Sequence, residues 1–335
     1  MVGLSGAARR VPSLVPGLVW TSSIAFAAWL GSLVVPVLGA AVLAILLGVA
    51  LGAIRRPPAV AAPGIAFSAT RLLQVAIVVL GTGLSLGEVV RVGARSLPVM
   101  LGTLAVALAG ALLVGRLLAV SPRLRTLIGV GTGICGASAI AVVSGIVEAT
   151  GTEVAYAIST IFAFNIAAVV LFGPIGRALD LSQHGFGLWA GTAINDTSSV
   201  VAAAYAYGHA AGSQAVVVKL TRTTLIVPIA LALSAWRGRR AGSSPRERRP
   251  HLPPFLILFV AASALDTLGL IPSDLHRPLS DTALALIAVA LAGVGLSAEL
   301  TRMRHTGVRP LLLGAVLWVG VATTSLLLQA LGHQL

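Results

Sequence analysis

The sequence predicts an all-α polytopic membrane protein, and three observations support this fold class. Of its 335 residues, 57% are hydrophobic and only 10% are charged, a balance that is unusual for soluble domains. Apolar runs of about twenty residues recur along the whole chain, and each is long enough to cross a hydrocarbon core of ~30 Å. The arginines gather in alternate connections between these runs, which is the distribution typical of a membrane protein.

We expect about eleven transmembrane helices, organised as one transmembrane domain that covers residues 1–335. A basic stretch that is rich in Gly, Ser and Pro, 237–254, is expected to be a flexible cytoplasmic linker between spans 17–236 and spans 255–331. The expected helices are 17–31, 34–54, 64–84, 97–115, 126–146, 154–174, 186–207, 213–236, 255–271, 279–298 and 311–331.

The positions of the basic residues predict the orientation of the chain. With the N-terminus in the cytoplasm, 17 of the 23 basic residues lie on the inner side and only Arg91, Arg95 and Arg277 lie on the outer side. The positive-inside rule therefore predicts a multi-pass membrane protein whose N-terminus lies on the cytoplasmic side and whose C-terminus lies on the opposite side. Topology also explains the net charge of +13, so no nucleic-acid partner is expected.

Two related motifs interrupt the expected spans 126–146 and 186–207. The first is GTGICGASA, which begins at Gly131, and the second is GTAINDTSS, which begins at Gly191. Glycines break helices, and broken backbone in hydrocarbon costs several kcal/mol for each unpaired group unless it lines a polar cavity. Two discontinuous helices that carry hydroxylated side chains predict the substrate site of a secondary transporter.

An internal repeat accompanies these motifs at an offset of 212 residues. Residues of spans 64–84 and 97–115 recur in spans 279–298 and 311–331, with an odd number of spans between them, so the copies are expected to be inverted in the membrane. The two broken spans, by contrast, are expected to run in the same direction. The matched residues are Gly81, Gly83, Leu84, Ser85, Pro98 and Gly102 with Gly293, Gly295, Leu296, Ser297, Pro310 and Gly314.

Charged residues within the spans suggest the charge of the substrate. Arg71, Lys219 and Arg222 are expected near the middle of the membrane, where a charge is costly unless it has a partner, a cavity or a substrate. Asp196 is the clear mid-span acid, so the surplus of positive charge favours an anion. Two alternatives stay open: Asp196 pairs with a cation or caps the second half of its helix, and Lys219 reaches the membrane surface.

The predicted substrate site combines the two motifs with these cations, because N-terminal ends of helices offer N–H donors to anions. Cys135 is expected to be a small packing residue, and Asn165 to hydrogen-bond to the broken helices or to a neighbouring helix. No catalytic residue, cofactor or metal is expected, because no phosphate-binding loop, zinc spacing or dinucleotide motif is present. The candidate residues are Thr132, Gly133, Gly136, Ala137, Ser138, Asn195, Asp196, Thr197, Ser198, Arg71, Lys219 and Arg222.

Together with KLTRTTLIVPIAL, which begins at Lys219, the two motifs resemble the YeiH-like family of bacterial inner-membrane proteins. Sulfate export is attributed to that family, so the resemblance implies a secondary exporter of sulfate or a related anion. The family often has a His before the Asp of the second motif and a Gln three residues after it. This sequence has Asn195 and Ser199 at those positions.

The function that the sequence favours is secondary transport of a small inorganic or sulfur-containing anion across the lipid bilayer, and not catalysis. A cation/proton antiporter that uses Asp196 is an alternative, although a single carboxylate supplies few ligands for a cation. An intramembrane enzyme that uses Cys135 or Asp196 is a further alternative, but the sequence offers no evident second catalytic group for it. A purely structural membrane subunit would not need the buried charges, and assembly into a homo-oligomer stays open.

Overall fold

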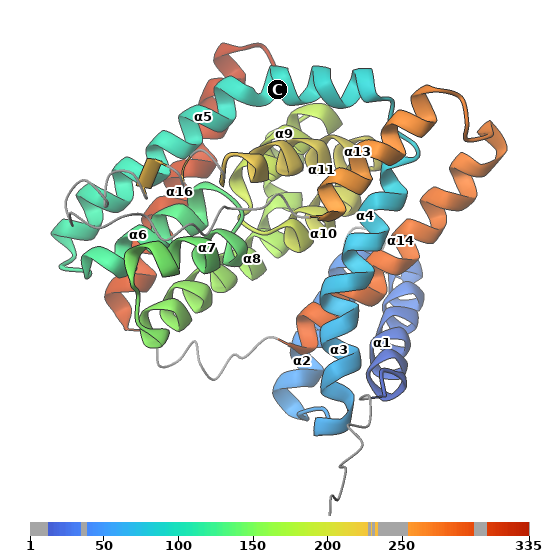
Figure 1. Ribbon diagram of the computed structural model, residues 1–335, viewed down its shortest axis with the longest axis horizontal. Helices are drawn as coiled ribbons and strands as arrows, with labels where there is room; N and C mark the ends of the chain where they lie inside the picture. Colours follow the sequence, from blue (N-terminus) through green and yellow to red (C-terminus); the bar gives the residue numbers. More distant parts are fainter. Residues whose placement is uncertain are drawn as a thin grey trace, which may run out of the picture.

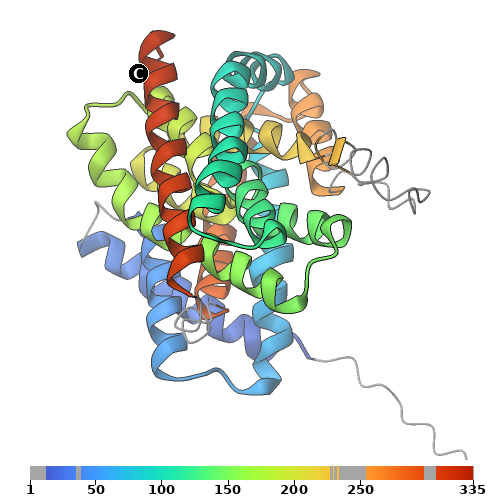
Figure 2. The ribbon, with the colours of Figure 1, turned by 90° about the vertical axis from the view of Figure 1, so that its left-hand side faces the viewer.

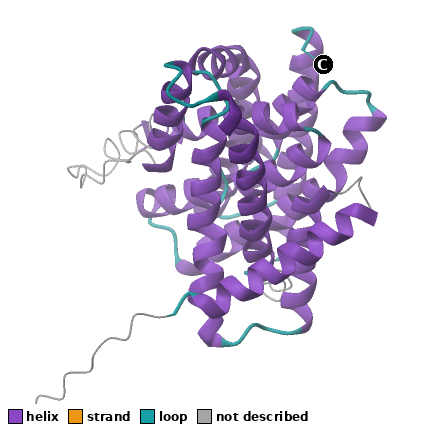
Figure 3. Cartoon of the chain, turned by 90° about the vertical axis from the view of Figure 1, so that its right-hand side faces the viewer, coloured by secondary structure: helices purple, strands orange, loops and turns teal. Residues whose placement is uncertain are grey.

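A computed structural model describes residues 13–34, 39–226, 254–297 and 307–334, together with the single residues 229, 232 and 233. All regular structure in this part of the chain is helical, as Figure 3 shows. Six of the described helices are long and apolar enough to cross a membrane. The prediction of an all-α polytopic membrane protein is therefore confirmed for the described residues.

One group of helices forms the right-hand part of Figure 1. In it α2 packs on α14 so closely that a side chain at Gly48 would lie 2.6 Å from the carbonyl oxygen of Ala292. A turn, η2, leads into one continuous helical rod made of α3, the π-helical turn η3 and α4. The bounds are α1 Val15–Val34, α2 Gly39–Ile54, η2 Ala59–Ala61, α3 Ala62–Phe67, η3 Ser68–Leu72, α4 Leu73–Gly81, α13 Pro254–Thr267 and α14 Ser273–Leu296.

The second group lies to the left in Figure 1 and is reached through α5, a long helix that contains Pro98. Figure 2 shows α16 running beside α5, and the two helices pack together. Four short helices, α6, α7, α9 and α10, correspond to the two interrupted spans. The bounds are α5 Leu86–Leu117, α6 Pro122–Gly133, α7 Ala137–Val147, α8 Gly151–Ala178, α9 Gln183–Ala193, α10 Thr197–Tyr207, α11 His209–Thr224 and α16 Val308–Leu331.

Helices α6 and α7 form a re-entrant hairpin, which we call hairpin A. The hydroxyl of Ser121, the N-cap of α6, donates to Glu153 Oε1 in the first turn of α8 at 2.7 Å. If α7 continued in the direction of α6, its end would lie on the order of 35 Å from Ser121. The connection 148–150 between α7 and α8 is much too short to return over that distance. The helix therefore breaks at the predicted place, but its second half turns back.

Helices α9 and α10 form a second hairpin, hairpin B, by the same criterion. The ring of Phe186, early in α9, stacks on the ring of Tyr207, at the end of α10, with centroids 3.8 Å apart. A continued helix would separate these residues by about 30 Å. The hydroxyl of Tyr207 also donates to the carbonyl of Leu181 at 2.6 Å, which places the end of α10 beside the residues that precede α9.

The two hairpins point at each other from opposite ends of the molecule. Hairpin A starts and ends where α8 begins, whereas hairpin B starts and ends where α8 finishes. Gln183, at the start of α9, accepts a hydrogen bond from the N–H of Ala210, so α11 starts at the same end as hairpin B. The expected spans 126–146 and 186–207 are thus corrected: neither crosses the molecule from one end to the other.

This correction predicts the accessibility of two surface positions. If the N-terminus is cytoplasmic, as the basic residues predict, Thr152→Cys should react with a membrane-impermeant maleimide only from the cytoplasm, and Leu179→Cys only from the periplasm, because α8 carries the chain from one side to the other between them. Both residues are exposed, and the native Cys135 is buried, so the unmodified protein is the blank. With eleven straight spans the two positions would exchange sides.

Candidate functional site

The tips of the two hairpins, residues 134–136 and 194–196, meet inside the second group of helices. Gly136 has φ = +64°, a conformation that glycine adopts without strain, and it ends the turn between α6 and α7. A Cβ atom at Gly136 would lie 3.5 Å from Cβ of Asp196 and 3.6 Å from the carbonyl oxygen of Asn195. The motifs that begin at Gly131 and Gly191 are therefore in van der Waals contact.

Lys219 joins the two tips from α11. Its ammonium group is fully buried and donates to the carbonyl of Ile134 at 3.1 Å and to the carbonyl of Ile194 at 2.7 Å. These are the equivalent residues of the two motifs, and each follows the last residue of its first half-helix. One side chain thus holds the tip of hairpin A against the tip of hairpin B.

Arg222, one helical turn further along α11, binds the same two half-helices. Its Nε donates to the carbonyl of Gly133 at 2.7 Å and its Nη2 to the carbonyl of Thr132 at 3.2 Å, both at the end of α6. Its Nη1 donates to the carbonyl of Thr192 near the end of α9. The guanidinium is fully buried, so its recorded donors serve the main chain of both hairpins.

These contacts change the role that the cations were expected to have. The C-terminal end of a helix carries roughly half a negative charge and up to four unpaired carbonyls. Lys219 and Arg222 neutralise both C-terminal ends at once, and their recorded hydrogen bonds go to the protein main chain. This geometry supports the prediction that both cations lie deep in the protein beside the broken helices. It does not support the prediction that they bind a substrate directly.

Asp196 is the N-cap of α10. Its carboxylate accepts hydrogen bonds from the N–H of Ser199 at 2.8 Å, from the hydroxyl of Ser198 at 2.5 Å and from the hydroxyl of Ser199 at 2.8 Å. Among the described residues it forms no ion pair with Arg71, Lys219 or Arg222. Of the two alternatives for Asp196, the structure therefore favours the helix cap.

The N-terminal ends of α7 and α10 are the accessible part of this region. Ala137 and Ser138 are exposed, and Asp196 and Thr197 are half-buried, whereas the C-terminal ends of α6 and α9 are buried. No side chain caps the first turn of α7, whose N-cap is Gly136. We call the exposed edge formed by Ala137, Ser138, Asp196 and Thr197 the rim.

Two buried polar side chains behind the rim have no hydrogen-bond partner among the described residues. They are the hydroxyl of Thr132, which is 1% exposed, and the side-chain amide of Asn195, also 1% exposed. The N–H of Asn195 donates to Asn165 Oδ1 at 3.2 Å. Of the two partners expected for Asn165, the structure therefore has the broken helices. Buried polar groups usually pair with protein, water or a ligand, so the Thr132 hydroxyl at the end of α6 and the Asn195 amide just before α10 are candidates for contact with a polar ligand.

Arg71 does not join the other candidates. It lies on the π-helical turn η3 in the first group of helices, is exposed, and donates to Gln74 at 3.4 Å. The carbonyls of Thr132 and Gly133 accept hydrogen bonds from Arg222, and the hydroxyl of Ser198 donates to Asp196, so these residues stabilise the backbone on either side of the tips. Gly136, Ala137, Ser138, Asn195, Asp196 and Thr197 lie at the contact between the tips or on the rim.

Sequence reasoning missed a set of polar contacts to α16. The hydroxyl of Thr192 is 2.7 Å from that of Ser325, and the side-chain amide of Gln329 donates to Ser325 at 3.0 Å. All three residues are fully buried. Ser325 and Gln329, four residues apart in an apolar span, are the signal that could have revealed this contact. Cys135 is buried in an apolar cluster, which agrees with its expected packing role.

The carbonyl contacts predict that Arg222→Gln lowers stability as well as function. The substitution leaves buried carbonyls of both hairpins without a donor, at ~1–3 kcal/mol for each unsatisfied group. The melting temperature of the purified protein in detergent should fall clearly, whereas Arg71→Gln, at an exposed arginine, should leave it nearly unchanged. Equal melting temperatures for the Arg222 variant and the wild type would contradict the claim that Arg222 holds the two hairpins together.

Comparison with known proteins gives the family of this chain. The family model "Conserved hypothetical protein 698" matches residues 16–314. The chain is 39% identical over 326 residues to the UPF0324 membrane protein SAG1125 of Streptococcus agalactiae, covering 95% of this chain and 97% of that protein. It is 41% identical over 305 residues to the UPF0324 membrane protein spr0034 of Streptococcus pneumoniae, covering 88% and 90% of the two chains.

No solved structure matches the chain. The family match covers most of the sequence and agrees with the motifs that resemble YeiH-like proteins. The chain therefore belongs to the conserved hypothetical protein 698 family, whose matched relatives are UPF0324 membrane proteins.

Proposed function

We propose that this membrane protein is a secondary transporter that binds a small anion at the rim. The observation that carries the proposal is that the four helix ends at the tips differ in their burial and in whether a side-chain charge neutralises them. Both C-terminal ends are buried and neutralised by Lys219 and Arg222, while the N-terminal end of α7 is exposed and that of α10 is half-buried. The carboxylate of Asp196 already caps α10, so the uncapped N-terminal end of α7, with roughly half a positive charge and unpaired N–H groups, is the end that suits an anion.

The charge around the tips also favours an anion. Lys219 and Arg222 contribute two formal positive charges, and the carboxylate of Asp196 contributes one negative charge whose recorded donors lie in its own helix. The four helix ends sum to about zero, because N- and C-terminal ends are present in equal number. With both side chains protonated, the region keeps one net positive charge. The hydroxyls of Ser138 and Thr197 and the amide of Asn195 would bind the oxygens of an oxyanion.

The substrate class follows from this chemistry together with the family resemblance. We propose a small inorganic or sulfur-containing oxyanion such as sulfate, moved outward across the inner membrane. Purified protein in proteoliposomes should take up or release sulfate, sulfite or thiosulfate, and should not move sodium. Transport of sodium without any of the anions would contradict the proposal.

Pairwise packing supports an inverted-repeat architecture, which is typical of secondary transporters. α2 packs on α14, and α13 packs on α4. Gly295 of α14 touches the main chain of α2 at Ile45, and Gly81 of α4 lies against the carbonyl of Phe259 in α13. We infer two nested repeats: α2, α4 and α5 match α13, α14 and α16, and hairpin A with α8 matches hairpin B with α11.

We infer the same orientation as before, with a cytoplasmic N-terminus and a periplasmic C-terminus. Replacing two crossing spans by hairpins reverses the direction of α8 alone, so Arg177 moves from the inner to the outer side. The inner side then has 16 basic residues and the outer side has 4. This still obeys the positive-inside rule.

Asp196 decides between this proposal and a proton-coupled antiporter. The potential alone can drive export, because a divalent anion leaving a cytoplasm at −100 mV gains ~4.6 kcal/mol, a concentration ratio of over ~1,000 at ~1.4 kcal/mol per tenfold. Asn is as good an N-cap as Asp. Asp196→Asn should therefore retain anion flux driven by the membrane potential, at a reduced rate.

Asp196→Ala is the matched variant, since it removes the cap at a cost of about 1 kcal/mol and should impair flux more than Asp196→Asn. Both variants are compared in proteoliposomes with the pH gradient held at zero and the potential set by potassium and valinomycin. If wild-type flux stops when the pH gradient is removed and Asp196→Asn is inactive, Asp196 carries a proton and the antiporter hypothesis is correct.

A further inference from the structure

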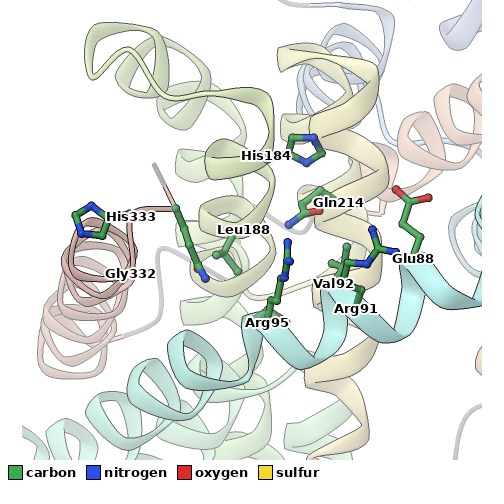
Figure 4. Close-up of a pocket in the computed structure, with 11 residues that line it drawn as sticks. Glu88, Arg91, Val92, Arg95, His184, Leu188, Gln214, Gly332 and His333 are labelled. Atoms are coloured by element: carbon green, nitrogen blue, oxygen red, sulfur yellow. The ribbon is translucent and has the colours of Figure 1, made fainter.

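A cavity of about 640 Å³ lies away from the hairpin tips, between the start of α5, the start of α9, α11 and the end of α16 (Figure 4). Its floor includes Ser96 and Leu188, which are 1% and 4% exposed. The carbonyl of Leu188 accepts the hydroxyl of Thr192, so the floor lies one helical turn from a residue that Arg222 holds. In the orientation inferred above, the cavity opens on the periplasmic face.

The lining of this cavity is basic. Arg91 and Arg95 lie four residues apart on α5, on one face of the helix, and both side chains extend toward the side where Gln214 and His184 lie (Figure 4). Both arginines are exposed, and within the described residues neither has a recorded hydrogen bond or ion pair. His184 and His333 add two imidazoles, and Glu88 is the acidic residue in the lining.

Two neighbouring guanidinium groups are well suited to a tetrahedral oxyanion. Each presents N–H donors in a planar fork that can bind two oxygens of a phosphate or sulfate group. Gln214 adds a neutral amide, which can donate to a third oxygen. The cavity is large enough for such a group. The hydroxyl of Ser96 on its floor donates to the carbonyl of Gly93, so the donors for an anion are the two arginines and Gln214.

We propose that this cavity is a second anion site, which binds a tetrahedral oxyanion of the sulfate or phosphate class through Arg91 and Arg95. The group belongs either to a free anion in the periplasm or to the headgroup of an anionic phospholipid, because the cavity lies at the edge of the membrane. The site is separate from the rim and does not depend on the transport activity proposed above.

Protection of the arginines from phenylglyoxal tests the proposal directly. Peptide mass spectrometry measures the rate at which each arginine is modified in delipidated protein in neutral detergent, with sodium sulfate, with sodium phosphate, or with sodium chloride at the same ionic strength. Modification of Arg91 and Arg95 should become several-fold slower with sulfate or phosphate than with chloride. Arg116, which is exposed at the other end of α5, should react at one rate throughout.

A second arm uses nanodiscs of phosphatidylglycerol or of phosphatidylcholine without added sulfate or phosphate. Protection only in phosphatidylglycerol identifies the occupant as a lipid headgroup, and protection by the free anions identifies a soluble ligand; either result supports an oxyanion site. Equal modification of Arg91 and Arg95 under all conditions would overturn the proposal.

Two variants separate this site from the rim. Arg91→Gln combined with Arg95→Gln should remove the binding of sulfate or phosphatidylglycerol that the protection experiment detects in the wild type, with little change in melting temperature because both residues are exposed. Gly136→Ala, which strains the tip of hairpin A, should leave the protection of Arg91 and Arg95 intact. If protection disappeared in the Gly136 variant while the protein remained folded, the two sites would not be separate and the proposal would fail.

Discussion

The structure depends on how the main chain is hydrogen-bonded where the two hairpin tips meet inside this membrane protein. Each hairpin tip ends a helix in a region where unpaired carbonyls cost several kcal/mol and no bulk water compensates them. Lys219 and Arg222 of α11 supply donors to Thr132, Gly133 and Ile134 on one side and to Thr192 and Ile194 on the other. One helix therefore allows two hairpins to end at the same place, and the exposed N-terminal ends are a consequence.

Much of this arrangement could be predicted from the sequence. The glycines of the two motifs and the polar residues after them correctly predicted two breaks. Of the three cations expected near the middle of the membrane, Lys219 and Arg222 are buried beside the breaks, whereas Arg71 is exposed elsewhere. The direction of the chain after each break could not be predicted, because an interrupted apolar run fits a crossing helix and a hairpin equally well. The contacts that decide, such as Ser121 with Glu153 and Phe186 with Tyr207, are tertiary. The arginine distribution did not help either, since α8 and its turns carry only Arg177.

The hairpins also account for an apparent conflict between the two motifs. As parts of straight spans separated by one other span, they would run in the same direction and could not be related by an inverted symmetry. As hairpins on either side of the crossing helix α8, they start from opposite ends and point at each other. The equivalent residues Ile134 and Ile194 then bind the same ammonium group, and Gly136 faces Asp196. Arg222 was expected to bind the substrate because a buried charge needs a partner. Its carbonyl partners could not be foreseen, because they come from segments 30 and 89 residues away in sequence.

Contact between the two tips is the central claim, and a disulfide tests it most directly. The 3.5 Å between Cβ positions at Gly136 and Asp196 is within the range that a disulfide requires. Gly136→Cys with Asp196→Cys, in a Cys135→Ala background and with a protease site inserted in the turn between α8 and α9, should oxidise within one chain. After cleavage the two fragments should stay together on a non-reducing gel and separate on a reducing gel. Separation of the fragments without reductant, in a variant that still melts cooperatively, would contradict the account.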